Sequence, residues 1–270
     1  MAEIYETSEI NRERIKKYLE EGKRFDGRKP DEFREIIIQQ GVSKNAEGSV
    51  RVKIGKTEVV VGVKLDVAEP YPDSPNKGNL MVTAELLPLS SPRFESGPPK
   101  FPAIELGRLV DRAIRESKFI DFEKLCIKEG EKVWSVFIDI YSINDEGNLI
   151  DAATIGAIAA LKMTKMPKYD EKEGKVLYDE DTGKKIPLTK DIPICITAHK
   201  IGPTIIVDPT LEEEDVSEAK ITIGATPEGI ISSMQKGSPS ELSVEEVHEM
   251  LDMTEKIRKK VFSSIKEYLD

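Results

Sequence analysis

The spacing of apolar residues along the chain predicts a mixture of strands and helices. Short alternating or β-branched runs predict strands at residues 33–39, 49–54, 57–65, 80–87, 133–143, 192–199, 204–207, 220–225 and 229–234. Longer patterns predict helices at residues 8–21, 106–117, 150–163 and 243–269. The last of these opens with the capping box Ser243-x-x-Glu246. Strands and helices in this order favour an α+β fold.

The helix predicted in the middle of the chain has the clearest amphipathic pattern. Its apolar stripe recurs at helical spacing and consists of Leu106, Leu109, Val110, Ala113, Ile114 and Ser117. The opposite face holds Arg108, Arg112 and Arg115, at i, i+4 and i+7. Neighbouring side chains at this spacing lie about 5–6 Å apart, so the three guanidinium groups should form one line.

This arginine line has two interpretations. Guanidinium groups bind phosphates in a bidentate manner, and their spacing suits successive phosphates of a single nucleic-acid strand. Alternatively, Glu105, Asp111 and Glu116 are close enough along the helix to pair with the arginines in a solvated network. The spacing alone leaves both open.

The predicted elements divide the chain into two related halves. We expect an N-terminal helix over residues 1–23 and a first half over 24–165. Residues 166–190 are polar and include an Asp181-Thr-Gly183 turn, which predicts a linker or an inserted hairpin. A second half should then follow over residues 191–270.

Composition narrows the class of protein. Of the residues in the chain, 39% are hydrophobic and 33% are charged, which suits a soluble globular protein. The sequence contains no run of 18 apolar residues, so no membrane span is predicted. A net charge of −10 argues against a general nucleic-acid coat but leaves room for a local basic patch. Cys126 and Cys195 lie in apolar strand-like runs, so we expect unreactive core thiols and a cytoplasmic location. With only two histidines, a histidine metal site is not expected.

An acidic cluster precedes the strand predicted at residues 220–225. Its five carboxylates are Asp208, Glu212, Glu213, Glu214 and Asp215. Carboxylates at a sheet edge commonly hold Mg²⁺ or transfer protons. Lys220 follows at once, and its ammonium group would compete with a metal and accept no hydrogen bond. The plainer interpretation is a solvated acidic turn.

Four segments, in their order and spacing, resemble the RNase PH family of phosphorolytic exoribonucleases. They are Arg24-Phe-Asp-Gly-Arg28, residues 47–61, the helix start after Gly147, and residues 208–224. Within this family the chain resembles the non-catalytic ring subunits of the archaeal exosome, including the N-terminal helix and residues 104–112. The resemblance covers roughly residues 24 to 265.

The resemblance implies an RNase PH-like fold of two related halves, of the ribosomal protein S5 domain 2-like type. It also implies a ring of three heterodimers, each pairing this chain with a catalytic RNase PH-like homologue. RNA-binding cap subunits would cover one face, single-stranded RNA would be the substrate, and no cofactor would be bound.

Three departures from the catalytic pattern predict that this chain has no catalytic activity on its own. The resemblance implies a pair of aspartates in active members. These two positions align here with Glu214 and Lys220, so the charge at the second position is reversed. Their phosphate-binding Gly-Ser-Arg or Gly-Thr-Arg becomes Gly147-Asn148-Leu149, and leucine cannot hold phosphate. An arginine pair just before the Glu-Leu of the central helix becomes Phe101-Pro102. The resemblance thus leaves Arg108, Arg112 and Arg115 as expected RNA contacts, with no catalytic residue and no metal.

Further expectations concern the flanks of these motifs. Asp151 should cap the helix that begins after Asn148, and the loop with Arg93 and Lys100 could line an RNA channel. Two other functions stay open. One is an active exoribonuclease that uses Asp208, Glu213, Glu214 and Asp215 with a metal. The other is an acidic scaffold with no RNA role.

Overall fold

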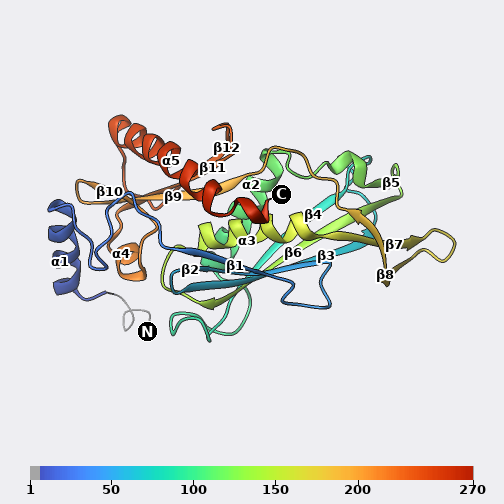
Figure 1. Ribbon diagram of the computed structural model, residues 1–270, viewed down its shortest axis with the longest axis horizontal. Coiled ribbons are helices and arrows are strands. Elements are labelled where there is room, and N and C mark those ends of the chain that lie inside the picture. The colour runs from blue at the N-terminus through green and yellow to red at the C-terminus, as the bar shows by residue number, and fades with distance from the viewer. Residues whose placement is uncertain (1–6, 270) are drawn as a thin grey trace.

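The computed structural model describes residues 7–269 and confirms the α+β class (Figure 1). The strands are β1 Ile36–Gln40, β2 Gly48–Ile54, β3 Thr57–Ala68, β4 Asn79–Leu86, β5 Cys126–Lys128, β6 Lys132–Asn144, β7 Lys165–Asp170, β8 Lys175–Lys185, β9 Ile194–Ile201, β10 Thr204–Val207, β11 Ala219–Ala225 and β12 Ile231–Gly237. The helices are α1 Glu9–Glu20, α2 Phe101–Glu116, α3 Leu149–Met163, α4 Leu211–Val216 and α5 Val244–Ser264. Two 3₁₀ turns occupy Phe122–Leu125 and Lys266–Tyr268.

Two main sheets organise these elements. The larger has the order β1-β2-β3-β6-β4, with β5 beside β6, and only the β4–β6 pair is parallel among the neighbours described. The smaller sheet is antiparallel with the order β10-β9-β11-β12. All nine predicted strands are present, with bounds shifted by a few residues. Strand β4 therefore lies at one edge of the large sheet and α2 packs on it.

Strands β7 and β8 form a separate hairpin that projects from one end of the molecule (Figure 1). The predicted turn at 181–183 is wrong, because the chain reverses at residues 171–174 and closes on Gly174, whose φ is +67°. Gly183, with φ of +71°, lies inside β8 where the register with β7 slips. Its positive φ is absorbed by a bulge rather than by a chain reversal.

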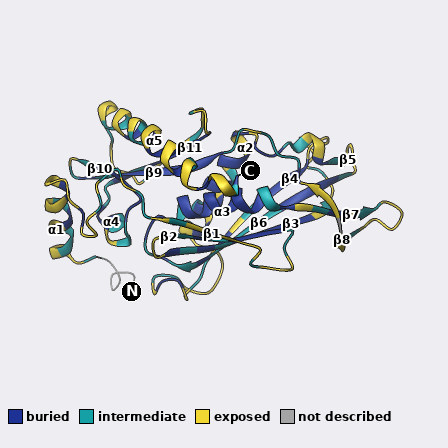
Figure 2. Ribbon diagram, viewed as in Figure 1, coloured by how far each residue is buried: buried dark blue, intermediate teal, exposed yellow. Residues whose placement is uncertain are grey.

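Helix α3 is buried between the two sheets (Figures 1 and 2). It packs on β2 and β3 on one side and on β9 on the other. Small residues permit this approach: a Cβ added at Gly156 would lie 2.7 Å from a methyl of Val61. Overpacking of this kind costs about 1–3 kcal/mol. The start of α3 is thereby fixed where both sheets meet.

The terminal helices cover outer surfaces, and each exposes one face (Figure 2). Helix α1 begins after its N-cap Ser8, and its buried residues Ile15 and Leu19 form a small cluster with Ile201, Ile206 and Val216. Residues 1–6 of the predicted N-terminal segment lie outside the described range. The last predicted helix ends at Ser264, and a 3₁₀ turn replaces its final residues.

Candidate functional site

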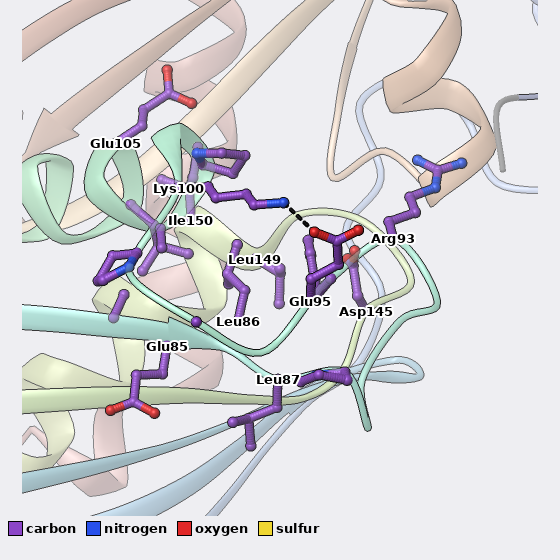
Figure 3. A pocket seen from close by; sticks show the side chains of 18 of the residues that line it. Glu85, Leu86, Leu87, Arg93, Glu95, Lys100, Glu105, Asp145, Leu149 and Ile150 are labelled. Carbon is purple, nitrogen blue, oxygen red and sulfur yellow. Dashed lines mark hydrogen bonds and ion pairs between the residues drawn. The ribbon is translucent and has the colours of Figure 1, made fainter. Parts of the chain in front are cut away.

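A partly open cavity of about 500 Å³ lies beside the start of α3 (Figure 3). Its walls come from β4, the loop of residues 93–100, the first turn of α2, the start of α3, helix α4 and strand β11. The three sequence departures meet here, since Glu214, Lys220, Leu149 and Pro102 all line it. We call it the α3 pocket. In Figure 3, Leu149 and Ile150 contribute its apolar part and Lys100 reaches across to Glu95.

Glu214 occupies the position where the start of α3 could hold an anion. Its Oε1 accepts a hydrogen bond of 2.7 Å from the backbone amide of Asn148, the N-cap of α3. Burial, together with the nearby charge of Asp145, raises the pKa of Glu214 to about 7. Helix N-termini attract anions through free amides and the helix dipole. The protein's own carboxyl group therefore takes one amide that a bound phosphate would need.

Gly147 lets this loop pass close to the acidic segment. Its φ is +84°, and a Cβ there would lie 2.6 Å from the carbonyl oxygen of Pro209. Asn148 has φ of +63° and donates from Nδ2 to Oδ1 of Asp208 at 2.7 Å. Leu149 follows as the first residue of α3. The turn is thus built around internal contacts.

Lys220 pairs across the pocket. Its Nζ lies 3.1 Å from Oε2 of Glu105 on α2 and donates a hydrogen bond to it. Asp208, Glu213, Glu214 and Asp215 take other partners. The lysine instead ties β11 to α2.

Asp208 is neutralised by two arginines that precede β1. Nη1 of Arg28 donates to Oδ2 at 2.8 Å, and Nε and Nη2 of Arg34 donate to the same carboxylate at 2.9 and 2.7 Å. Burial opposes ionisation, but the Arg34 hydrogen bonds and the two positive charges hold the pKa of Asp208 below its ordinary value. The Arg34 guanidinium also donates to the carbonyl oxygens of residues 146, 147 and 209.

Glu213 and Asp215 each have an arginine of their own. Arg24 binds the buried Glu213 through Nε and Nη2, and it also donates to the carbonyl oxygens of Val207 and Asp208. Arg93 binds Asp215 in a bidentate manner, with both distances 2.6 Å. The hydroxyl of Thr7 donates to the same carboxylate.

These contacts bear on two expectations about the acidic cluster. A solvated turn is wrong, because α4 forms here behind a complete capping box and Asp208 and Glu213 are buried. The four carboxylates expected to hold a metal also have separate partners: Asp208, Glu213 and Asp215 bind arginines, and Glu214 accepts a hydrogen bond from the Asn148 amide. Within residues 7–269, no group of three or more acidic, histidine or cysteine side chains is placed to share a metal ion.

Asp151 does not cap α3 through its side chain. Its carboxylate crosses to β9, where it accepts hydrogen bonds from the amide and hydroxyl of Thr197 at 3.1 and 2.8 Å. Burial raises its pKa to about 7. The expectation is wrong because Asp151 faces the second sheet, and the free amide of the N-cap is satisfied by Glu214 instead.

The three arginines of α2 are exposed, but their pairing differs. Arg115 binds Asp111 through Nε and Nη2 and also donates to the carbonyl oxygen of Leu80. Within the described residues, no hydrogen bond or ion pair engages Arg108 or Arg112. Glu105 is occupied by Lys220. The solvated network therefore describes Arg115, while Arg108 and Arg112 remain available.

Sequence reasoning missed the structural arginines. Arg24 and Arg28 belong to a recognised motif without an assigned role, and Arg34 interrupts an apolar run assigned to a strand. The strand actually begins at Ile36, which leaves Arg34 free to turn toward Asp208. A charged residue inside an apolar run was the available signal. Arg93, expected near a channel, lines the α3 pocket but is bound to Asp215.

The remaining expectations concern thiols and membranes. Cys195 is a buried core thiol, as predicted, and burial raises its pKa to about 12. Cys126 is only partly buried. Among residues 7–269, no helix is both long and apolar enough to cross a membrane.

Two family models match most of the chain. Domain 1 of the 3′ exoribonuclease family (RNase PH) matches residues 32–167, and domain 2 matches residues 191–257. The chain belongs to this 3′ exoribonuclease family. Relatives in the family include the exosome complex component Rrp42 of Methanocella arvoryzae, 50% identical over 90% of this chain and 91% of the relative. The Rrp42 component of Methanothermobacter thermautotrophicus is 44% identical over 97% of this chain and 95% of the relative.

Solved members of the RNase PH family share the fold. A chain of the Archaeoglobus fulgidus exosome with RNA bound to the active site superposes with a TM-score of 0.87 and 42% identity. The match covers 95% of this chain and 98% of that chain. An archaeal exosome core chain gives a TM-score of 0.83 at 39% identity, over 95% and 96% of the two chains. The RNase PH-like fold of two domains is therefore confirmed.

Proposed function

We propose that this chain is a non-catalytic ring subunit of an exosome that degrades RNA from the 3′ end with phosphate. It would pair with a catalytic RNase PH-like homologue, complete that homologue's active site, and guide single-stranded RNA into it. Three such heterodimers would form the cytoplasmic ring, with RNA-binding cap subunits on one face. The names of the relatives and the solved exosome chains support this assignment.

The main support for a lack of catalytic activity is the charge pairing inside the α3 pocket. Phosphorolysis needs an inorganic phosphate held beside the scissile bond by positive groups. Each cation that lines the pocket is already paired: Arg93 with Asp215, Lys100 with Glu95 and Lys220 with Glu105. Leu149 supplies no charge, and Glu214 occupies the amide at the start of α3. A phosphate entering this pocket would meet carboxylates.

The arginines of α2 support the RNA-guiding role. Arg108 and Arg112 are exposed and lack an acidic partner within residues 7–269. Unpaired guanidinium groups on a chain of net charge −10 form a local cationic surface suited to phosphodiesters. Arg115, held by Asp111, would contribute less. On this proposal, the α3 pocket would hold no phosphate, and the exposed face of α2 would contact the RNA strand.

The direct test compares three preparations: the chain alone, its catalytic homologue alone, and the mixture. Each is incubated with single-stranded RNA, Mg²⁺ and phosphate, and released nucleoside diphosphates are measured. We expect no release by this chain alone and faster release by the mixture than by the homologue. Release by this chain alone would identify an active exoribonuclease instead. A mixture no faster than the homologue, with no RNA bound, would identify a scaffold.

A further inference from the structure

A second hollow lies on the other side of α2, between this helix and edge strand β4. This β4–α2 groove has a volume of about 410 Å³. Its floor includes Val82 and Ala84 of β4, and Gly107 of α2 lies against them. A Cβ added at Gly107 would be 3.2 Å from the carbonyl oxygen of Val82. Glycine therefore allows the helix to approach the edge strand and defines the groove between them.

The two ends of the groove differ in chemistry. One end is apolar and is lined by Pro99, Ala103 and Ile104. The other end holds Arg108 and Arg112. Ile104 keeps 51% of its surface exposed and lies one helical turn before Arg108 and two turns before Arg112. The rise of a helix separates Ile104 from Arg108 by about 6 Å.

The polar groups around the groove are already engaged. Asp111 accepts both hydrogen bonds from Arg115, and the hydroxyl of Thr83 donates to Asp139 at 2.6 Å. These side chains would not compete for the arginines or for the edges of a base. The groove therefore offers an apolar surface and two guanidinium groups.

We infer that the β4–α2 groove is a subsite for one nucleotide of the RNA strand, with Ile104 as its base-packing residue. The phosphate lies at Arg108 and Arg112, and the base packs on Ile104 and Pro99. The inference rests on the proposed function, because it assumes that RNA passes along α2. Packing on an apolar surface tolerates every base, so the subsite reads no sequence.

A protein segment is the competing occupant, and the charges favour RNA. Two guanidinium groups without acidic partners lose their hydration when a protein surface covers them, and this loss is costly unless new anions are supplied. A phosphodiester supplies that anion at every nucleotide. The combination of a cationic end with an apolar end matches a nucleotide, which pairs an anion with a flat apolar ring.

The experiment measures RNA affinity in the complex assembled with the catalytic homologue, without phosphate so that the RNA stays intact. The test variant is Ile104→Ala. The control is Ile37→Ala, which removes an isoleucine of equal exposure, 51%, from β1 at the opposite edge of the same sheet. We expect Ile104→Ala to weaken binding on the order of 5-fold, near the low end of the range for stacking contacts, and Ile37→Ala to leave it unchanged.

RNA strands with one abasic nucleotide at successive positions sharpen the test. With the unaltered chain, one abasic position should weaken binding more than its neighbours. With Ile104→Ala that position should no longer differ. Loss of this difference in the variant supports base packing on Ile104, and a difference that persists overturns it.

The other outcomes separate this inference from the proposed function. If Arg108→Ala and Arg112→Ala weaken RNA binding but Ile104→Ala does not, the subsite is wrong and the RNA-guiding role stands. If none of these changes affects binding, both fail. If Ile104→Ala leaves RNA affinity unchanged but disrupts assembly, measured by light scattering after size exclusion, the groove binds a protein and the inference is overturned.

Discussion

Two regions of the sequence contain clustered charges: the acidic segment of residues 208–220 and the exposed face of α2. In the structure, their charges differ in whether they are paired. In the acidic segment, Glu213 and Asp215 each bind one arginine and Asp208 binds two. On α2, Arg108 and Arg112 face solvent without an acidic partner in the described chain. Charges that are paired and buried hold the fold together, whereas charges left unpaired are available to a ligand.

The largest expected effect comes from removing one partner of a buried ion pair in the acidic segment. Arg24→Ala removes the cation paired with the buried carboxylate of Glu213 and the donor to two backbone carbonyls. Removing one partner of a buried pair costs about 3–5 kcal/mol. We expect that loss in the free energy of unfolding, measured with urea at pH 7. Lys23→Ala, at an exposed neighbour, should change it by less than about 0.5 kcal/mol. Equal effects of the two changes would refute the structural role of Arg24.

The second effect depends on pH and concerns Glu214. A carboxyl group whose pKa rises to about 7 on folding favours the folded state when protonated, so stability is lost as pH rises from about 4.5 to 7. Glu214→Gln keeps an acceptor for the Asn148 amide and removes this loss. We expect Glu214→Gln to increase the free energy of unfolding at pH 8 by on the order of 3 kcal/mol, and by under about 1 kcal/mol at pH 5. A gain independent of pH would show that Glu214 ionises normally.

The third effect tests the unpaired arginines. In the assembled complex, replacing Arg108 and Arg112 together by alanine should weaken RNA binding about 10-fold at moderate salt. The slope of log K against the logarithm of the salt concentration should also become shallower by about 1.4, since each phosphate contact to a single strand contributes about 0.7 to that slope. Arg115→Ala is the matched control, because Asp111 already engages that guanidinium. Fluorescence anisotropy over a salt series measures both quantities. A larger effect from Arg115 would reverse the comparison.

The smallest expected effect is on catalysis by the α3 pocket. Lys220→Asp restores the charge sign expected at the second position of the aspartate pair. We expect no nucleoside diphosphate release by the altered chain alone, because Leu149 still supplies no cation and Glu214 still binds the Asn148 amide. Measurable release would show that the reversed charge was the only obstacle.

Much of the fold could be predicted from periodicity. The amphipathic stripe of α2 and the small residues of α3 are local patterns. Helix α3 was placed within one residue, whereas α2 begins at Phe101, about five residues before the predicted start. The turn of the β7–β8 hairpin was misplaced, because Asp181-Thr-Gly183 and Gly174 are both plausible turn signals and only pairing decides between them.

The site was harder to predict because its contacts are distant in sequence. The partners of Asp208 are Arg28 and Arg34, and the partner of Lys220 is Glu105. No local pattern links residues separated by more than a hundred positions. Sequence could show that charges were unusual, but only the packing of the two sheets around α3 shows which of them cancel.

The central claim is that this chain guides RNA for a catalytic partner and performs no chemistry itself. Its most direct test is kcat/KM for RNA phosphorolysis by the assembled complex carrying Arg112→Glu. Lys17→Glu, an exposed charge reversal on α1, provides the control. Because a carboxylate on the arginine face repels the RNA phosphates, we predict a fall of at least about 10-fold for Arg112→Glu and no change for Lys17→Glu. An unchanged kcat/KM with Arg112→Glu would contradict the claim.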